Sequence, residues 1–227
     1  MQPYIFPYIG YYQLINAVDK FVIYDDVNYI NRGWINRNNI LVNGKGYLFT
    51  IPLQDASQNR LINEIEIAVD EAWKKKFLRT VEQSYKKAPY YNDVCPIITA
   101  TVYSTATHVC EFSSLSLRAV MEYLEIPVEF VSSSSIYNNR ELKGQDRILD
   151  ICMKENSDHY INPIGGMEIY SEELFQKAGI KLNFIQCKPI TYRQFNNEFV
   201  SHLSIIDVLM FNDKEAVTDM LQSYELI

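Results

Sequence analysis

The feature that most constrains the fold is an alternation of short apolar runs with amphipathic segments, near the start of the chain and again over residues 128–186. Residues 21–25 (FVIYD) form an apolar run with β-branched side chains, which is typical of a buried strand. Apolar side chains recur at helical spacing over Leu142–Glu155, between strands expected at Val128–Ser132 and His159–Asn162. Strand–helix–strand order needs crossover connections, so the sequence predicts an α/β, Rossmann-like fold with a mainly parallel sheet.

A hairpin and a helical stretch interrupt this order between about residues 38 and 125. Asn38–Val42 and Tyr47–Pro52 flank Asn43-Gly44-Lys45-Gly46, a sequence that favours a hairpin turn. Apolar side chains at spacings of three and four predict that Thr101–Leu124 is largely helical. No obvious linker divides the sequence, so we expect one domain over residues 1–227 with this region as an insertion.

The composition argues against several classes of protein. The formal net charge is −7 and the pI is about 5.1, which disfavours a broad nucleic-acid surface. No run approaches the roughly 18 apolar residues that span a bilayer, and the first residues lack the basic region of a signal peptide. We therefore expect a cytoplasmic protein without a membrane span. Four scattered cysteines give no spacing for a disulfide framework or a metal site.

Polar clusters follow the expected strands, at the edge where an open α/β sheet binds its ligands. Asp25 and Asp26 end a buried strand, where partial desolvation raises the pKa of a carboxyl group and suits it to general-base catalysis. The alternative is that one of them pairs with Arg32 or Arg37. Both arginines also suit a phosphate or carboxylate ligand, because a guanidinium group presents a planar fork of donors.

The other candidate binding residues are expected on the same rim. Six of the 17 tyrosines fall within the first 29 residues, and Gly10 opens a helix where backbone N–H groups could approach an anion. These aromatic side chains would equally suit the core or an oligomer interface. The candidate ligand-binding residues are Gln2, Pro3, Tyr4, Pro7, Gly10, Tyr11, Asn28, Tyr29, Arg32, Trp34, Arg37, Asn38, Lys143, Arg147, Asn162, Gly165 and Gly166.

Four motifs together resemble the WbqC-like protein family of bacteria. They are QPYIFPYIGYYQLI from residue 2, DKFVIYDDVNYINRGWINRN from residue 19, INPIGGMEIY from residue 161 and LSIIDVLM from residue 203. The resemblance runs over nearly the whole chain. Members of this family are associated with surface-polysaccharide (O-antigen) gene clusters. The resemblance therefore implies a role in making or modifying a surface glycan, with an activated amino sugar as the small-molecule substrate.

Two departures from the family pattern bear on the mechanism. Members usually begin a few residues earlier, with an apolar strand that leads into the Gln-Pro pair, and the sequence leaves open whether a start codon lies upstream of Met1. A histidine often precedes that pair or lies in the helix around Trp73, where this chain has Met1 and Phe77. The order of strand, proline-bearing loop, glycine at a helix start and second strand is also similar to that in nucleotidylyltransferases with an HxGH loop. Tyr8 and Tyr11 stand in place of those histidines, and a phenol is not a charged donor at neutral pH.

The sequence thus favours a transferase that adds an acyl or aminoacyl group to the amine of a nucleotide-linked sugar. Asp25 or Asp26 would accept the proton of the sugar amine. The phosphates would be held by Arg32, Arg37 and Lys143. A ring of the ligand would stack on Trp34 or Tyr4. The alternatives are a non-catalytic nucleotide-sugar-binding protein and a nucleotidylyltransferase, against which the missing histidine pair counts. The sequence does not identify a cofactor.

Overall fold

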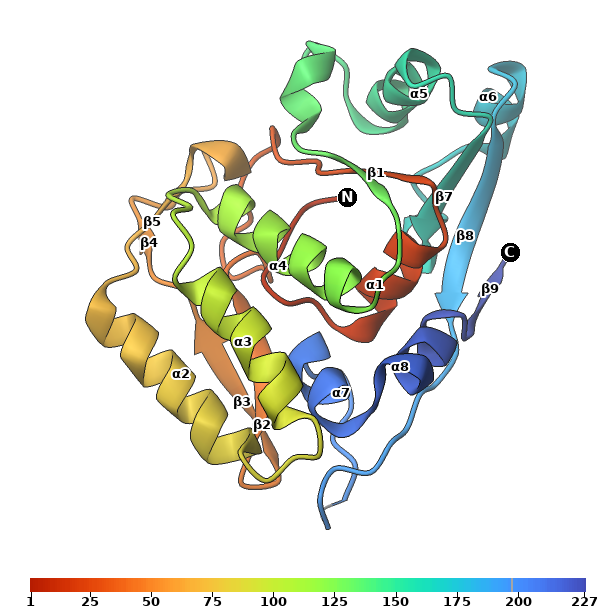
Figure 1. The fold of residues 1–227 in the computed structure, drawn as a ribbon. Helices are drawn as coiled ribbons and strands as arrows, with labels where there is room; N and C mark the ends of the chain where they lie inside the picture. Colours follow the sequence, from red (N-terminus) through yellow and green to blue (C-terminus); the bar gives the residue numbers. More distant parts are fainter. Residues whose placement is uncertain (197) are drawn as a thin grey trace.

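The computed structural model describes residues 1–196 and 198–227, which form a mixed α/β structure of small sheets and flanking helices (Figure 1). The α-helices are α1 (Ile9–Asn16), α2 (Glu71–Tyr85), α3 (Tyr91–Val102), α4 (Val109–Tyr123), α5 (Gly144–Lys154), α6 (Glu172–Lys177), α7 (Ile205–Phe211) and α8 (Lys214–Leu221). The strands are β1 (Lys20–Val22), β2 (Arg37–Val42), β3 (Lys45–Thr50), β4 (Leu53–Gln54), β5 (Glu66–Ile67), β6 (Glu129–Val131), β7 (His159–Pro163), β8 (Lys181–Cys187) and β9 (Tyr224–Leu226). Short 3-10 turns are η1 (Ile62–Glu64), η2 (Ser134–Tyr137) and η3 (Ile164–Gly166). None of the helices described here has the length and apolar character needed to cross a bilayer.

The strands pair in small groups. β1 runs parallel to β6, and β7 runs parallel to β8, which pairs antiparallel with β9 on its other edge. β2 pairs with β3, and β4 with β5, both antiparallel. Within the described parts of the chain, no ladder joins β1 to β7. The expected Rossmann-like sheet is therefore not confirmed, although two parallel pairs of it form.

The hairpin of β2 and β3 confirms the turn that the sequence predicts. Val42 pairs with Lys45, which leaves a two-residue loop. Asn43 and Gly44 have φ angles of 50° and 73°. Both central residues are thus left-handed, as a type I′ turn requires, and the Asn-Gly dipeptide adopts that conformation at little energetic expense.

The segment Thr101–Leu124 is largely helical, as the sequence predicts, but two separate helices share it. The apolar stripe is present, but α3 ends at Val102 and α4 begins at Val109. The intervening backbone pairs with the segment around β5 instead: the N–H of Ile67 donates to the carbonyl of Thr107 at 2.9 Å. Side-chain periodicity could not show this break, because the competing hydrogen-bond partners lie some forty residues away in sequence.

The largest hydrophobic cluster lies where α1, the β2–β3 hairpin, α2–α4, α7 and α8 meet. It joins the first forty residues of the chain to the last twenty-five. A separate cluster under β7, β8 and α6 is built around Phe175. Fully buried members of the largest cluster include Tyr12, Ile15, Ile40, Val81, Tyr85, Val120, Ile206 and Leu221.

A buried carboxylate connects several of these elements through hydrogen bonds. Asp207 of α7 has no exposed surface and accepts hydrogen bonds from Tyr85 at 2.8 Å, Tyr192 at 2.7 Å and Gln194 at 2.6 Å. The hydroxyl of Tyr85 in turn accepts from the backbone N–H of Leu41 at 2.7 Å. Burial raises the pKa of Asp207, and these donors act in the opposite direction. One side chain thus links α7 to α2, β2 and the segment after β8.

We expect Asp207→Leu to lower the free energy of unfolding by about 3 kcal/mol or more, because three buried donors would lose their acceptor. Urea unfolding measures this change. Asp219→Leu, at an exposed position of α8, should change the stability by about 0.5 kcal/mol at most. Equal losses in the two variants would contradict the role assigned to Asp207.

Candidate functional site

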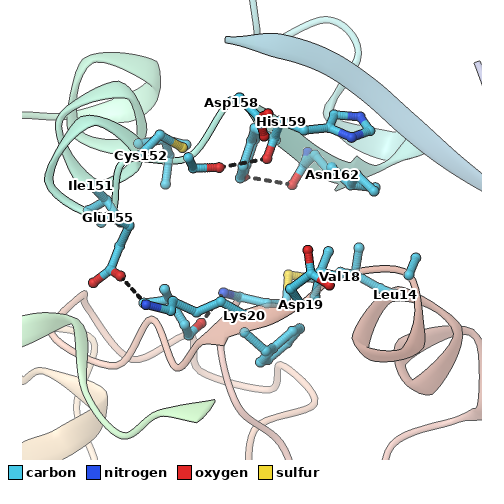
Figure 2. Close-up of a pocket in the computed structure, with 18 of the residues that line it drawn as sticks. Leu14, Val18, Asp19, Lys20, Ile151, Cys152, Glu155, Asp158, His159 and Asn162 are labelled. Atoms are coloured by element: carbon cyan, nitrogen blue, oxygen red, sulfur yellow. Dashed lines mark hydrogen bonds and ion pairs between the residues drawn. The ribbon is translucent and has the colours of Figure 1, made fainter. Parts of the chain in front are cut away.

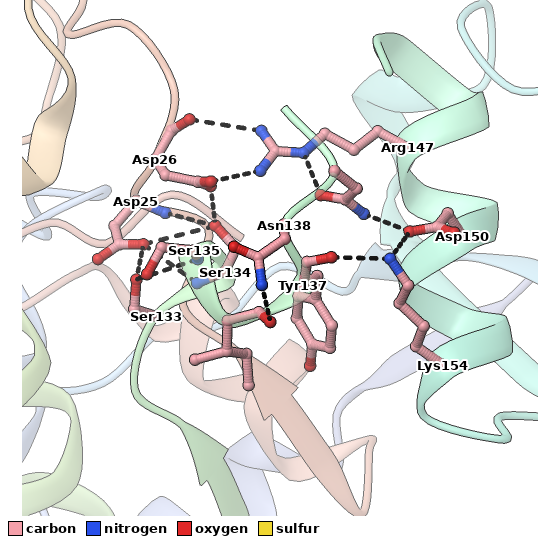
Figure 3. Close-up of polar contacts among 12 residues, drawn as sticks. Asp25, Asp26, Ser133, Ser134, Ser135, Tyr137, Asn138, Arg147, Asp150 and Lys154 are labelled. Atoms are coloured by element: carbon pink, nitrogen blue, oxygen red, sulfur yellow. Dashed lines mark hydrogen bonds and ion pairs between the residues drawn. The ribbon is translucent and has the colours of Figure 1, made fainter. Parts of the chain in front are cut away.

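The residues that follow β1 and β6 meet and form the centre of the candidate site (Figure 3). β1 and β6 are parallel neighbours, so Asp25 and Asp26 after β1 lie against Ser133 and Ser134 after β6. Arg147 of α5 completes the group. Polar side chains therefore gather beyond the carboxyl ends of parallel strands, as the sequence predicts for this part of the rim.

Asp25 is buried but keeps one carboxylate oxygen available. Its Oδ1 accepts from the hydroxyl of Ser133 at 2.7 Å and from the N–H of Ser134 at 3.1 Å. No residue that the structure describes donates to its Oδ2. Burial raises the pKa of Asp25, while its serine and backbone donors oppose this shift. Asp25 is thus a stronger base than an exposed aspartate.

Asp26 forms a buried ion pair with Arg147. Asp26 Oδ2 lies 2.5 Å from Arg147 Nη2, and the two side chains are only 2% and 4% exposed. Arg147 Nε donates to Asn139 Oδ1 at 2.9 Å, and the guanidinium group lies over the ring of Tyr24, 4.8 Å from its centroid. Ser134 donates to the other oxygen of Asp26. This carboxylate is therefore fully engaged within the protein.

The arginine partner comes from a distant part of the chain. The sequence left open a pairing of an aspartate with Arg32 or Arg37, but the partner of Asp26 is Arg147, 121 residues away. Ionised side chains this well buried need a partner, and the aspartate supplies it. Arg147 thus positions Asp26, and its role as a ligand-binding residue stays a prediction.

The network continues along α5 and holds η2 in place. Asn139 donates to Asp150 Oδ2 at 2.6 Å, and Lys154 Nζ lies 2.7 Å from the same carboxylate. Lys154 also donates to the carbonyl of Tyr137 at 2.7 Å. The loop that carries the serines is therefore anchored at both ends, so the hydroxyl groups are preorganised around the aspartates.

A cavity of about 380 Å³ lies beside this network, between β1 and β7 (Figure 2). Tyr24, whose ring stacks with Arg147, forms part of its wall, as does Asn162. At the far end, Lys20 forms an ion pair with Glu155 at 2.6 Å. The cavity thus extends from an ion pair at the start of β1 to the border of the aspartate network.

The loop at the start of the chain is packed inward. The hydroxyl of Tyr11 donates to the carbonyl of Gln2 at 2.8 Å, and the ring of Tyr4 meets that of Tyr11 edge to face at 5.2 Å. The side-chain amide of Asn38 donates to the carbonyl of Phe6 at 2.6 Å. Phe6 has a φ of 38°, so this clamp holds a strained backbone. In this structure, these predicted ligand-binding residues contact other parts of the protein.

The start of α1 is covered by an aromatic ring. A methyl group on Gly10 would lie 2.4 Å from the ring of Tyr8. A side chain at this position would displace the ring of Tyr8, which packs against the backbone of Gly10. Burial raises the pKa of Tyr8, and the neighbouring Cys187 adds to the shift.

The remaining predicted residues are spread over several surroundings. Trp34 is 53% exposed, and the guanidinium group of Arg37 lies 5.8 Å from its ring centroid. Tyr29 lies instead in a buried apolar cluster, where its hydroxyl donates to Asn36. Of the other candidates, those on the surface are Asn28, Arg32, Lys143 and Gly165, and those that are buried are Pro3 and Pro7.

The Gly-Gly pair after β7 contains one glycine that packing requires. A methyl group on Gly166 would lie 1.8 Å from Asn162 Nδ2, whereas nothing lies within 4 Å of one on Gly165. Asn162 Oδ1 accepts from the hydroxyl of Tyr160 at 3.2 Å. The second glycine therefore lets Asn162 turn back over the loop at the end of β7.

The sequence places Ser133, Ser134 and Asn139 on the same rim as Asp25 and Asp26, but they are not among the candidate binding residues that it predicts. Their signal was their place directly after the predicted strand Val128–Ser132, where polar residues collect.

Burial, followed by the charge of Asp25, raises the pKa of Cys110 to about 12, so this thiol stays protonated at neutral pH. Among the residues that could be searched, no cluster of three or more His, Cys, Asp or Glu side chains is placed to hold a metal ion.

Comparison with known proteins identifies one matching family and one similar protein. The model of the WbqC-like protein family matches residues 2–219. The chain is 28% identical over 222 residues to the uncharacterized protein Rv1507c of Mycobacterium tuberculosis, a match that covers 95% of this chain and 93% of that protein. No solved structure is significantly similar to the chain.

We expect Arg147→Met to lower the free energy of unfolding by about 3–5 kcal/mol, because it leaves Asp26 buried without a cation. The double variant Asp26→Asn/Arg147→Met should lose less, since it removes the stranded charge. Arg140→Met, on the exposed side of the same loop, should stay within about 0.5 kcal/mol of the parent in chemical denaturation. Losses that simply add in the double variant would show that the pair is not coupled.

Gly166→Ala should destabilise the protein by about 1–2 kcal/mol, because the added methyl group displaces the amide of Asn162. Gly165→Ala is the matched control and should be neutral or slightly stabilising, since its methyl group meets open space. Thermal unfolding of the two variants side by side measures the difference. A Gly165 variant as unstable as the Gly166 variant would refute this explanation.

Proposed function

The chain belongs to the WbqC-like protein family, and from this premise we propose that it transfers an acyl or aminoacyl group to the amine of a nucleotide-activated sugar. Surface-polysaccharide biosynthesis in the cytoplasm is the process that the family's association with O-antigen gene clusters favours. The observation that carries the proposal is Asp25. It is a buried carboxylate of raised pKa with one oxygen fixed by serine donors and the other free to accept a proton.

The proposed step needs one base. The sugar nitrogen attacks the carbonyl carbon of an activated acyl donor, such as a thioester, and a carbon–nitrogen bond forms. Asp25 takes the proton that the nitrogen releases, the bond from the acyl carbon to sulfur breaks, and the proton passes to the departing thiolate. A carboxylate held in a partly desolvated position is a suitable base because its raised pKa brings it closer to neutral pH.

Recognition of the nucleotide part is assigned to the exposed and half-buried cationic and aromatic side chains that follow the aspartates. Arg32 and Arg37 offer donor forks for phosphates, and the exposed ring of Trp34 offers a stacking surface. Lys143, at the position just before α5, supplies a further cation. Binding would then extend from the surface around Trp34 toward Asp25.

A non-catalytic nucleotide-sugar-binding protein is the second candidate. The buried pair of Asp26 and Arg147 favours it, because two of the strongest charged candidates are used to hold the structure together. This function predicts tight binding without turnover. A nucleotidylyltransferase is less favoured, because Tyr8 and Tyr11 stand where that class has its pair of histidines.

A thermal-shift screen against nucleotide sugars, free nucleotides and acyl thioesters separates these functions. A ligand at 100 times its dissociation constant stabilises by about 2.7 kcal/mol, which is a readily measured shift. Pairs of stabilising ligands are then incubated together, and the sugar product is sought by mass spectrometry. Transfer supports the first function, and binding without product supports the second. No shift with any nucleotide would remove both.

Asp25→Asn should lower the transfer rate by about 10²–10⁴-fold while leaving the ligand-induced thermal shift intact. In the parent, the rate should fall with decreasing pH at a pH above the range of an exposed aspartate, since burial raises the pKa of Asp25. Initial rates over a pH series test this. Asp219→Asn, far along the chain in α8, should match the parent, and a fully active Asp25 variant would exclude this base.

The stability of the same variant provides a check on its fold. A carboxyl group whose pKa is raised by folding binds its proton more tightly in the folded state, so its ionisation destabilises the protein as the pH rises through that pKa. We therefore expect Asp25→Asn to have a Tm at neutral pH at least equal to that of the parent, with the gain disappearing in acid. Lost activity with a retained Tm then reports chemistry rather than unfolding.

A further inference from the structure

Alternation along β1 and β6 divides the candidate site between the two faces of this strand pair. Phe21 and Phe130 are register partners, and their ring centroids lie 5.8 Å apart, so both side chains point to one face. Side chains along a strand alternate between faces, which brings Asp25 to the same face as Phe21. Tyr24 points to the opposite face, where its ring contacts Arg147 of α5. Asp25 and Arg147 are therefore on different sides of the strand pair.

Arg118 of α4 lies on the same face as Asp25. Its guanidinium group lies over the ring of Phe130, 4.6 Å from the centroid. Its Nη2 donates to Ser132 Oγ at 3.0 Å and to the carbonyl of Phe130 at 3.4 Å. Ser132 directly follows β6, two positions before the register partner of Asp25. With strands about 4.8 Å apart and a rise of about 3.3 Å per residue, the main chains at Ser132 and Asp25 lie roughly 8 Å apart.

Arg118 is a half-buried cation without a counter-charge. Among the residues that the structure describes, no carboxylate forms an ion pair with it, and its Nε and Nη1 donate to no acceptor. Burial lowers the pKa of the guanidinium group, whereas a neighbouring carboxylate would raise it. A partly desolvated charge of this kind is stabilised by an anion that binds beside it.

A second unsatisfied polar group lies on the same edge of α4. Cys110, Ser114 and Arg118 are spaced four residues apart, so they share this edge. The charge of Asp25 reaches the thiol of Cys110, and Arg118 contacts Ser132. Both ends of the edge therefore face the end of the β1–β6 pair, and Ser114 faces it from between them. Ser114 is only 9% exposed, and its hydroxyl has no hydrogen-bond partner within the described chain.

This face of the strand pair thus offers hydrogen-bond acceptors and donors at separate places. Asp25 Oδ2 is an acceptor without a donor, which suits an amine. Arg118 and Ser114 offer donors without acceptors, which suit an oxyanion. A guanidinium group binds the oxygens of a carboxylate or a phosphate with its planar fork of donors. A small molecule that carries both an amine and an oxyanion matches this pattern.

We propose that Arg118 binds an oxyanion of the substrate, a carboxylate or a phosphate, while the amine of the same molecule lies at Asp25. The place of the amine rests on the proposed function, whereas the anion site rests on Arg118, Ser114 and Ser132 themselves. The substrate is thereby narrowed to amino sugars with an acidic group close to the amine. That group is either a carboxylate on the sugar or the phosphate attached to it.

The test uses inorganic phosphate and acetate as probes, because neither requires turnover. Each is titrated into nitrogen-15-labelled protein at constant ionic strength, and NMR follows the Nε–H of Arg118 and the amide of Ser132. Saturable shifts are expected at both positions, and the probe that binds more tightly distinguishes a phosphate site from a carboxylate site. The absence of a saturable shift with either probe would overturn the proposal.

Variants assign the binding to one side chain. Arg118→Met should weaken it by about tenfold or more, because the charged donors are lost. Arg118→Lys keeps the charge without the fork and should lie between this variant and the parent. Arg79→Met, at an exposed position of α2, is the matched control and should bind as the parent does. Unchanged binding in a folded Arg118 variant, as judged by its Tm, would overturn the proposal.

Kinetics separate the failure of this proposal from the failure of the proposed function. Where transfer is detected, Arg118→Met should raise KM by about tenfold or more and change kcat less, whereas Asp25→Asn lowers kcat. A KM that is unchanged in the Arg118 variant would overturn the anion site and leave the transferase intact. If no donor supports transfer, the proposed function fails, and the phosphate and acetate titrations still decide whether Arg118 binds an anion.

Discussion

The buried ion pair between Asp26 and Arg147 is the interaction on which the arrangement of the site depends. It connects the end of β1 to α5, which leads into β7, and so links the two parallel pairs of strands. Two charges with almost no exposed surface are tolerated only when each is matched by hydrogen bonds. Asn139 and Ser134 provide these, which explains why the loop after β6 is held so closely against α5.

This pairing gives two adjacent aspartates different properties. Asp26 is committed to a guanidinium group, whereas Asp25 receives only neutral donors and is left with a raised pKa. Neighbouring residues at the end of a strand point in different directions, so they can occupy unlike surroundings although they are joined by one peptide bond. Carboxyl groups separated in this way can take distinct roles, one structural and one in proton transfer.

The gap between the two parallel pairs places the cavity beside the same site. Tyr24 belongs to both, since its ring supports Arg147 and also lines the cavity.

The sequence by itself determined the features that depend on neighbours in the chain. It placed the hairpin turn at Asn43 and Gly44, and it placed Asp25 and Asp26 at the end of a buried strand. These follow from local backbone preference and apolar periodicity, which act over a few residues. Only the tertiary structure decided which charge Asp26 meets, and why Gly10 is a glycine. Arg147 is 121 residues from Asp26, and the space beside Gly10 is filled by a folded-over ring, so no local pattern encodes either contact.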